Sequence, residues 1–509
     1  MGGVRLSSVV LEGNDIYWIE GRPEEGGRNV IVRRSDDGRI VDLTPRHTNV
    51  RTRVHEYGGA AYVVSRGTIY YSEFADQRLY KLIPGVPPEP LTSPGDWFYA
   101  DGCVHPSREY LVSVREDHTD TEREATTMLV SVPLRGPQSG GHVIASGHDF
   151  YSTPRFSPDG SRLSWLTWDH PRMPWDGSEV WVANVSNGTL DDPVRIAGGE
   201  TEAIFQPGWS PDGTLHFVSD RTGWWNLYRV GSDGVELVHG MPADFGRPQW
   251  QLGMSTWAFA DGGRVVASYQ HRGRWHLATI DGRTRTFTRV PTDLEPGENM
   301  TATGAHAVFV GGAVTAPDAV VRVNLETGQA ETIRSAAVMA IDEGYLSPPT
   351  PIEYPTGGSL TAHAFHYPPR NRDFSAPLDD RPPLIVISHG GPTASTSARL
   401  NLEVQYWTSR GFAVVDVNYG GSSGYGRAYR RRLAGQWGVV DVADCVNAAT
   451  YLVAQGLADA DRLIIRGRSA GGYTTLAALT FCPEVFKAGA SYYGISDLEA
   501  MARDTHKFE

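Results

Sequence analysis

Short segments of alternating apolar and polar residues run through the first 340 positions, and a tight-turn sequence precedes each of them. The clearest copies are HPSREYLVSV, SPDGSRLSWLTW and SPDGTLHFVSD, whose prolines, Pro106, Pro158 and Pro211, lie 52 and 53 residues apart. Proline, aspartate and glycine suit the central positions of a tight turn, and the alternation after them is typical of a half-buried strand. Looser copies of the same turn and strand begin near Gly13, Gly67, Gly262 and Gly304.

These seven starts recur at intervals of roughly 40 to 54 residues, which is the period of β-propeller blades. In the clearest copies a second strand follows about ten residues later, as at Asn226–Val230, which fits the meander of a blade. We therefore predict a seven-bladed β-propeller over residues 1–340.

The pattern changes near Tyr345, where a proline-rich stretch begins. PLIVIS at 383–388 is a continuous apolar strand of the kind that is buried on both faces of a parallel sheet. Strands and helices alternate after it, which predicts a doubly wound α/β domain over residues 341–509. We expect its further elements to be a helix at 396–410, a strand at 412–421, a helix at 440–455, a strand at 462–467, a helix at 470–480 and a strand at 488–494.

The sharpest chemical motif is Gly-x-Ser-x-Gly at Gly467–Gly471, between a predicted strand and a predicted helix. In such a nucleophile elbow the residues that flank the serine must be small, and the turn presents the hydroxyl of Ser469 above the edge of the sheet. The N–H of Ala470 then lies at a helix N-terminus, where a developing oxyanion is stabilised. A glycine-rich turn with an idle serine is the alternative, but the flanking strand and helix favour the elbow.

Two other strand ends offer groups that could complete an acyl-transfer site. His389–Pro392 follows the strand at 383–388, and its backbone could line the oxyanion pocket, while His389 itself is expected to be structural. Tyr419 follows the next strand and offers a hydroxyl, although a core tyrosine is the simpler alternative.

Composition and charge exclude several classes of function. With 46 basic and 59 acidic residues the net charge is −13, which disfavours nucleic acid and anionic membranes as partners. The basic triplet Arg430–Arg432 is expected on a solvated helix face. No apolar run approaches the ~18 residues of a membrane span, and no export signal or metal-binding spacing is visible. We therefore expect a cytoplasmic protein with no metal or other cofactor, and with reduced thiols at Cys103, Cys445 and Cys482.

Longer words of the sequence indicate a family. TRVHEYGG at Thr52–Gly59, SDRTGWWNLY at Ser219–Tyr228 and GRSAGGYTT at Gly467–Thr475 follow one another in order. With these words the chain resembles the prolyl oligopeptidase family over essentially its whole length, and especially its branch of dipeptidyl aminopeptidases and acylaminoacyl-peptidase-like enzymes. The resemblance implies an N-terminal propeller that caps a C-terminal α/β-hydrolase domain, and a serine peptidase that cleaves short peptides.

The resemblance also assigns roles to residues. It implies that Ser469 is the nucleophile and that the Tyr419 hydroxyl and the Ala470 N–H form the oxyanion hole. It places Ile495 in the lining of the specificity pocket. Glu56 could bind the free α-amine of a substrate, as propeller-borne glutamates do in dipeptidyl peptidases, but a structural glutamate buried by hydrogen bonds is the favoured interpretation.

The catalytic triad is incomplete within this sequence. Hydrolases of this fold present serine, aspartate and histidine in that chain order, and the positions after Ser469 offer Asp497, Asp504 and His506. His506 precedes any further strand, so we do not expect it to reach Ser469. We expect the triad Asp and His beyond residue 509, and interpret the chain as a C-terminally truncated fragment with an incomplete, inactive hydrolase domain.

Two other functions are also compatible with these motifs. A carboxylesterase-type hydrolase shares the elbow but lacks a propeller, and a propeller with a hydrolase remnant could act as a non-catalytic binding module. In the peptidase hypothesis the propeller restricts substrate size and peptides are the partners, while homo-oligomer formation is left open.

Overall fold

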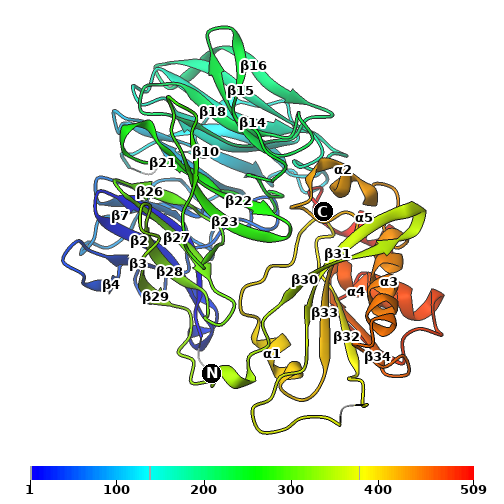
Figure 1. The fold of residues 1–509 in the computed structure, drawn as a ribbon. Coiled ribbons are helices and arrows are strands. Elements are labelled where there is room, and N and C mark those ends of the chain that lie inside the picture. The colour runs from blue at the N-terminus through cyan, green and yellow to red at the C-terminus, as the bar shows by residue number, and fades with distance from the viewer. Residues whose placement is uncertain (1–2, 137–138, 378) are drawn as a thin grey trace.

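The structure is a computed structural model that describes residues 3–136, 139–377 and 379–509. It consists of two parts that lie side by side (Figure 1). The N-terminal part is built of small antiparallel sheets, and the C-terminal part of one larger sheet with helices on both faces. No helix among the described residues is both long and apolar enough to cross a membrane.

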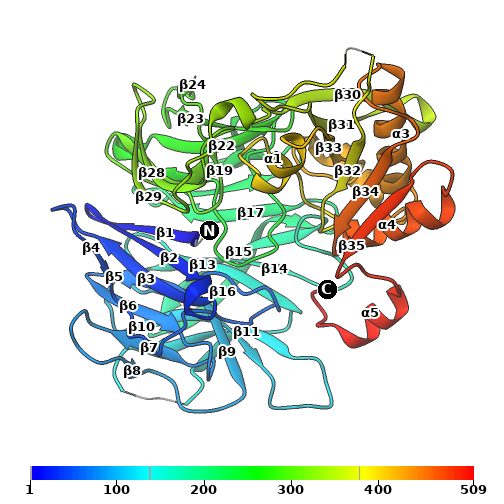
Figure 2. The ribbon, with the colours of Figure 1, turned by 90° about the horizontal axis from the view of Figure 1, so that it is seen from below.

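The described residues of the N-terminal part form seven sheets that radiate as blades from a common axis (Figure 2), and this confirms the predicted seven-bladed propeller. Neighbouring blades touch through their first strands and pack their faces together. Blade by blade, the strands are β1 (Arg5–Glu12), β2 (Asp15–Arg22), β3 (Arg28–Arg34) and β4 (Ile40–Asp42); β5 (Tyr62–Ser65), β6 (Thr68–Ser72), β7 (Leu79–Leu82) and β8 (Glu89–Pro90); β9 (Trp97–Val104), β10 (Tyr110–Asp117), β11 (Thr126–Pro133) and β12 (His142–Ala145); β13 (Phe150–Phe156), β14 (Arg162–Trp168), β15 (Ser178–Ser186) and β16 (Thr189–Gly199); β17 (Ile204–Trp209), β18 (Leu215–Ser219), β19 (Asn226–Gly231) and β20 (Gly234–His239); β21 (Trp257–Phe259), β22 (Val265–His271), β23 (Arg274–Ile280) and β24 (Phe287–Arg289); and β25 (Glu295–Pro296), β26 (Thr301–Thr303), β27 (His306–Gly312), β28 (Ala319–Asn324) and β29 (Ala330–Ser335).

The repeat in the sequence marks the same place in every blade. Each turn-plus-strand copy leads into the second strand, which is β2, β6, β10, β14, β18, β22 and β27 in chain order. Central strands are buried between neighbouring blades, and the burial of β10 and β14 is nearly continuous from the second residue onward. The axial first strands lack this regular alternation because bulges interrupt them, as between Ser7 and Val10 in β1.

The ring closes by packing of the first blade on the last. Leu6 and Val9 of β1 lie in one buried cluster with Val308 and Val310 of β27. This apolar contact joins the two ends of the propeller. Full burial of an apolar side chain of this kind contributes ~1.5–3 kcal/mol relative to exposure, so the cluster stabilises the closed ring.

The C-terminal part is a mixed six-stranded sheet in the order β30-β31-β33-β32-β34-β35. The strands β32, β33, β34 and β35 are parallel, and β30 and β31 are antiparallel at one edge. The bounds are β30 (Thr350–Thr356), β31 (Leu360–Tyr367), β32 (Leu384–Ser388), β33 (Ala413–Asn418), β34 (Leu463–Arg468), β35 (Ala488–Tyr492), α1 (Leu402–Thr408), α2 (Gly426–Arg430), α3 (Val440–Ala454), α4 (Ala470–Phe481) and α5 (Leu498–Asp504). Five 3-10 turns complete the described elements: η1 (Pro23–Glu25), η2 (Asp261–Gly263), η3 (Glu343–Tyr345), η4 (Gly357–Ser359) and η5 (Arg431–Leu433).

Alternate residues of the parallel strands serve the two faces of the sheet. α3 and α4 pack on one face against Val386 and Ile465, while α1 packs on the other against Ile385 and Val414. This is the α/β-hydrolase arrangement that was predicted, and it brings the ends of β32, β33 and β34 to one edge.

The first helix is shorter than predicted. The sequence predicts a helix at 396–410, but α1 begins after its N-cap Asn401, whose side chain accepts the N–H groups of Glu403 and Val404. The preceding residues are held in an irregular path, because the Thr396 N–H donates to Asn418 Oδ1 and the Thr396 hydroxyl donates to a buried carboxylate of β33.

The predicted solvated face at Arg430–Arg432 is wrong for Arg430. Its side chain is only 2% exposed and lies 2.6 Å from the Asp220 carboxylate of the propeller. Its guanidinium stacks over the Trp225 ring at 3.9 Å, and Arg427 contacts the same carboxylate. Asp244 accepts backbone N–H groups at the start of α2. Short α2 therefore serves as an anchor between the two domains, a role that helix periodicity in the sequence cannot reveal.

Candidate active site

Ser469 is the single residue between β34 and α4. Its backbone has φ 52° and ψ −121°, a conformation that residues with a side chain rarely adopt. Such strain persists only where the surrounding structure enforces it, and it is the geometry of a nucleophile elbow. The Ser469 N–H donates to the Tyr492 carbonyl of β35 at 3.1 Å, which ties the turn to the neighbouring strand.

The two glycines of the motif are required by space. A Cβ on Gly467 would lie 2.1 Å from the Gly471 carbonyl oxygen. A Cβ on Gly471 would lie 2.1 Å from the carbonyl oxygen of Ser388, at the end of β32. Both positions therefore exclude any side chain, and the turn is closed against the neighbouring strand end.

The N–H of Ala470 lies in the first turn of α4, where backbone N–H groups have no intrahelical acceptor. Ala470 is fully buried, and the aligned peptide dipoles of the helix add positive potential at this end. The geometry is thus suited to a negative oxygen beside Ser469.

The loop that follows β32 runs beside the serine. A Cβ on Gly390 would lie 3.6 Å from Ser469 Cβ, so this glycine allows the loop to approach the elbow closely. The Tyr419 hydroxyl lies 2.9 Å from the Pro392 carbonyl oxygen and 3.1 Å from that of His389. Tyr419 thereby holds the loop in place from the end of β33.

Tyr419 is fully buried, and burial raises the pKa of its hydroxyl well above the usual value. The group is therefore a neutral hydrogen-bond donor, and in this structure its proton is directed at loop carbonyls. Its predicted part in the oxyanion hole stays a prediction.

His389 is stacked on Tyr419 with ring centroids 4.3 Å apart. Its Nε2 lies 2.7 Å from the Ser422 hydroxyl, and its Nδ1 lies 2.8 Å from the Gly390 carbonyl oxygen. Burial lowers the pKa of His389 to about 4, so the ring is neutral at physiological pH. Through these contacts His389 holds the loop in place.

The two predicted substrate-binding residues lie on different domains. Glu56 is exposed, on a turn of the propeller with φ 64°, so the favoured interpretation of a buried structural glutamate is wrong. Ile495 is partly exposed in the segment after β35. Their predicted roles in substrate binding stay predictions.

The acidic and imidazole groups after Ser469 are engaged elsewhere. Asp497 caps α5 by accepting two N–H groups at its start, and Asp504 pairs with Arg503 at 2.9 Å. His506 Nε2 lies 3.2 Å from a carboxylate oxygen of Glu116, in the third propeller blade.

The propeller contributes a residue to the site that the sequence did not single out. Trp250 Nε1 donates to the Thr393 carbonyl oxygen at 2.7 Å, at the end of the loop beside Ser469. The ring of Trp250 lies in an aromatic group with Tyr57, Trp175 and Phe508. Trp250 lies outside the repeated strands, so only the contact across the domains identifies it.

Comparisons with known proteins agree with this geometry. The model of the prolyl oligopeptidase family matches residues 398–509. Over 158 residues the chain is 34% identical to dipeptidyl aminopeptidase BIII of Pseudoxanthomonas mexicana, a match that covers 31% of this chain and 23% of that protein. The chain thus matches about a quarter of the length of that curated relative.

Two solved structures are similar over a much longer span. A puromycin-hydrolyzing peptidase of Mycobacterium tuberculosis is 39% identical with a TM-score of 0.95, covering 99% of this chain and 80% of that one. A puromycin hydrolase is 37% identical with a TM-score of 0.93 and the same coverage. Together with the propeller, the hydrolase sheet and the strained serine, these matches show that the chain belongs to the prolyl oligopeptidase family.

Proposed function

We propose that this chain is the propeller and the nucleophile-bearing part of a serine peptidase that cleaves short peptides through an acyl-enzyme on Ser469. The observation that carries the proposal is the elbow: Ser469 at positive φ, enclosed by two obligatory glycines and placed at the start of α4.

In the proposed reaction the Ser469 oxygen attacks the carbonyl carbon of the scissile amide, and its proton passes to an imidazole base. The C–N bond of the tetrahedral intermediate then breaks while the leaving nitrogen takes that proton, and water later hydrolyses the ester. The Ala470 N–H would stabilise the oxyanion. The Tyr419 hydroxyl is the second proposed donor. It would donate its hydrogen bond to the oxyanion instead of to a carbonyl oxygen of the loop.

The base and the aspartate that orients it are proposed to lie beyond residue 509. Asp497, Asp504 and His506 are each held by other partners, as described above. Because a serine hydroxyl without a base is a poor nucleophile at neutral pH, the 509-residue chain alone is not expected to form an acyl-enzyme.

For the substrate we propose short peptides and aminoacyl amides. Two solved relatives are described as hydrolysing puromycin, and a curated relative is named a dipeptidyl aminopeptidase. The propeller that covers the hydrolase domain would restrict the size of the substrate. A cytoplasmic location is part of the same proposal.

Labelling with a fluorophosphonate probe tests the role of Ser469. We expect no labelling of the 509-residue chain, and labelling at Ser469 in a form of the protein that carries the residues beyond 509. Ser469→Ala in the longer form is the matched control. Labelling of the 509-residue chain at the rate usual for serine peptidases would show that the base lies within it.

Paired substrates separate a peptidase from an esterase. The longer form is given aminoacyl p-nitroanilides, puromycin and short acyl p-nitrophenyl esters at equal concentrations. Cleavage of the amides supports the proposal, whereas rapid ester cleavage with no amide cleavage contradicts it.

A further inference from the structure

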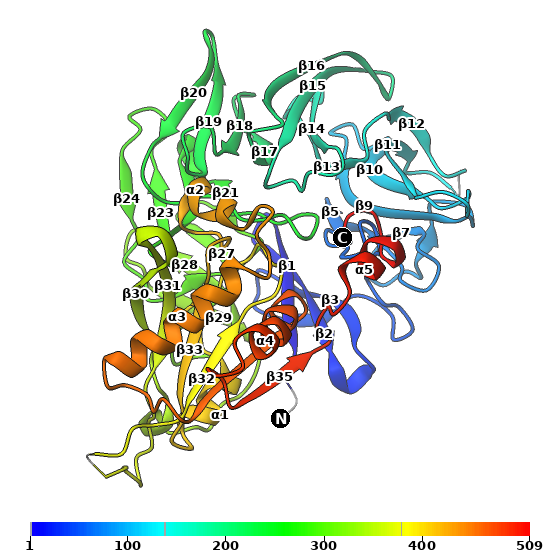
Figure 3. The same ribbon diagram turned by 90° about the vertical axis from the view of Figure 1, so that its right-hand side faces the viewer.

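A cavity of about 920 Å³, which we call the hydrolase cavity, lies where the parallel strands of the hydrolase sheet begin. Its lining includes Pro383, Gly411 and Arg462, which stand just before β32, β33 and β34. This edge lies at the opposite end of the sheet from α2 (Figure 3). Ser469 follows the far end of β34, so about 20 Å of strand separates it from the cavity. The hydrolase cavity is therefore separate from the elbow.

Hydrogen bonds between loops hold the walls of this cavity in place. The Arg370 N–H donates to the Thr408 carbonyl oxygen at 3.0 Å, and Asn371 Nδ2 donates to the Ser409 carbonyl oxygen at 2.8 Å. These bonds attach the loop after β31 to the end of α1. The Pro383 carbonyl oxygen accepts an N–H at the start of β33 at 2.9 Å, which fixes the loop before β32. The cavity thus has the pre-formed walls that are typical of small-molecule sites.

Basic side chains dominate the charge of the lining. Four arginines and one carboxylate belong to it: Arg370, Arg381, Arg410, Arg462 and Asp380. Among the described residues only Arg462 of these four forms ion pairs, at 2.7 Å with Asp380 and at 2.6 Å with Asp459. The other three guanidinium groups keep an uncompensated charge. In a chain whose net charge is −13, such a local surplus of positive charge indicates an anionic ligand.

Two of these three guanidinium groups are held in position. Arg410 Nη1 donates to the Tyr406 carbonyl oxygen at 2.9 Å, and the guanidinium lies 3.7 Å from the centre of the Tyr406 ring. Arg381 Nη2 lies 3.4 Å from the place that a Cβ on Gly456 would take. Arg381 is therefore at the C-terminal end of α3, where the helix dipole favours a cation. Side chains that are already ordered lose less freedom when a ligand binds.

The rest of the lining offers flat apolar surfaces. It includes four prolines, one phenylalanine and one leucine: Pro368, Pro369, Pro382, Pro383, Phe374 and Leu457. The Phe374 N–H donates to Asn371 Oδ1 at 3.2 Å, which fixes the backbone at this position. The Phe374 ring is 79% exposed, so its face is open to stacking by a planar group.

His366 is an independent sign of a ligand at this cavity. It belongs to the lining and is only 7% exposed, and its Nε2 has no hydrogen-bond partner among the described residues. Burial lowers the pKa of His366, so the ring is neutral at physiological pH. Buried polar atoms nearly always have a partner. A polar atom of a bound ligand would supply the partner that the protein does not.

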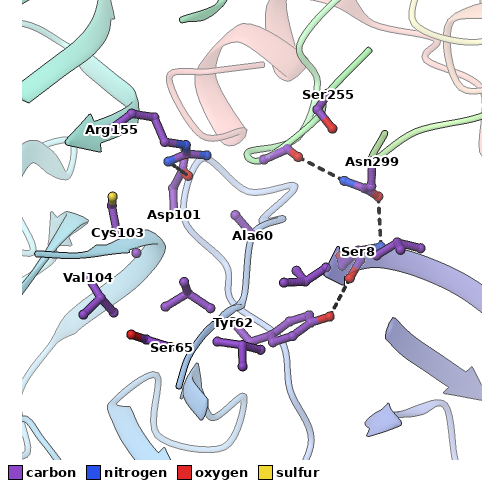
Figure 4. A pocket seen from close by; sticks show the side chains of 16 residues that line it. Ser8, Ala60, Tyr62, Ser65, Asp101, Cys103, Val104, Arg155, Ser255 and Asn299 are labelled. Carbon is purple, nitrogen blue, oxygen red and sulfur yellow. Dashed lines mark hydrogen bonds and ion pairs between the residues drawn. The ribbon is translucent and has the colours of Figure 1, made fainter. Parts of the chain in front are cut away.

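A cavity in the propeller shows the contrast. It has a volume of about 340 Å³ and lies among the first strands of the blades (Figure 4). Its arginine, Arg155, is already paired, because its Nη1 lies 2.9 Å from the buried carboxylate of Asp101. Asp101 also accepts the Thr153 N–H at 2.7 Å. The charges in the propeller cavity are thus balanced within the protein, whereas those in the hydrolase cavity are not.

We propose that the hydrolase cavity binds a small organic anion in which a carboxylate or a phosphate is joined to a flat apolar ring. The arginines bind the anionic oxygens, because guanidinium groups match the geometry of both head groups. Phe374 and the prolines cover the ring. The volume of about 920 Å³ lies within the range of ~300–1,000 Å³ that is usual for small-molecule sites. This site is independent of the proposed peptidase activity.

Isothermal titration calorimetry on the 509-residue chain tests the proposal without any catalysis. The probes 1-naphthyl phosphate and 1-naphthoate combine an anionic head group with a flat ring, whereas 1-naphthol and inorganic phosphate each offer one of the two features. We expect one molecule of either naphthyl anion to bind per chain with a Kd below about 1 mM. Binding of 1-naphthol and of inorganic phosphate should be at least tenfold weaker.

Substitutions then locate the binding. Arg370→Gln combined with Arg381→Gln should weaken both naphthyl anions at least tenfold, and Phe374→Ala should weaken them at least threefold. Arg39→Gln, at an arginine of the first blade that is 80% exposed, is the matched control and should change neither. The substituted side chains are all exposed, so the melting temperature should stay that of the parent chain. If the double variant melts earlier, the two single variants take its place.

The comparison of the two naphthyl anions identifies the preferred head group, and a preference in either direction supports the proposal. Absence of measurable binding of both anions at about 2 mM would overturn it. So would binding of unchanged strength in both the arginine variants and Phe374→Ala, because the anions would then bind elsewhere on the chain.

Discussion

Replacement of Asp220 by asparagine tests whether the α2 anchor stabilises the protein. The Asp220 carboxylate is fully buried and lies 2.6 Å from the Arg430 guanidinium, with Arg427 at the same oxygen. Asparagine keeps the size of the side chain and the acceptor for the Ala203 N–H, but removes the negative charge. The change therefore isolates the electrostatic part of the anchor.

The magnitude follows from the burial of the partners. Breaking a buried ion pair by removal of one charge costs ~3–5 kcal/mol, because the remaining charge is left without compensation. Asp244, buried nearby, still faces Arg430, so we expect the lower end, a loss of about 3 kcal/mol. With a urea dependence of about 3 kcal/mol per molar, the midpoint of the affected transition should fall by about 1 M.

Urea unfolding followed by tryptophan fluorescence is a suitable assay, because the Trp225 ring lies directly under the Arg430 guanidinium. Arg431→Gln is the matched control: Arg431 is exposed, and this change should move the midpoint by less than about 0.2 M. Added salt should leave the loss in Asp220→Asn unchanged, since buried pairs are screened little. A midpoint for Asp220→Asn equal to that of the control would refute the electrostatic reasoning.

Three further outcomes are expected. Gly471→Ala places a Cβ 2.1 Å from a carbonyl oxygen and should lower the melting temperature sharply, whereas Gly357→Ala, in open space, should not. Burial raises the pKa of Asp416 to about 7, so the native state keeps a proton that the unfolded chain releases near pH 4. The free energy of unfolding should therefore fall as pH rises from 4 to 7, by up to about 1.4 kcal/mol per pH unit. Asp416→Asn should flatten this pH dependence in urea titrations. Tyr419→Phe should cost about 1 kcal/mol through the lost loop hydrogen bond, and in the longer form an oxyanion role would also lower kcat about 10²-fold with KM little changed.

Local signals in the sequence were sufficient to predict the architecture of both domains. Tight turns before alternating strands located the second strand of all seven blades, because turn chemistry and burial between blades both act within a dozen residues. The elbow was predictable for the same reason, since Gly467, Ser469 and Gly471 meet constraints imposed by their own turn and by the adjoining strand end.

Contacts between domains were not predictable in this way. The local sequence predicts a solvated helix face for Arg430, but its partner Asp220 lies 210 positions earlier, in a propeller blade. Trp250 and Thr393 are 143 positions apart, and nothing in either local sequence marks the hydrogen bond between them. The helix predicted at 396–410 was shortened for a related reason, because the Leu400 N–H donates to the Ala313 carbonyl of the propeller.

The geometry beside Ser469 is therefore a property of both domains. The elbow fixes the serine from within the hydrolase sheet, and Tyr419 holds the adjoining loop from the end of β33. The far end of the same loop is held by Trp250, which belongs to the propeller segment between β20 and β21. A change in this propeller segment would therefore also disturb the loop beside Ser469.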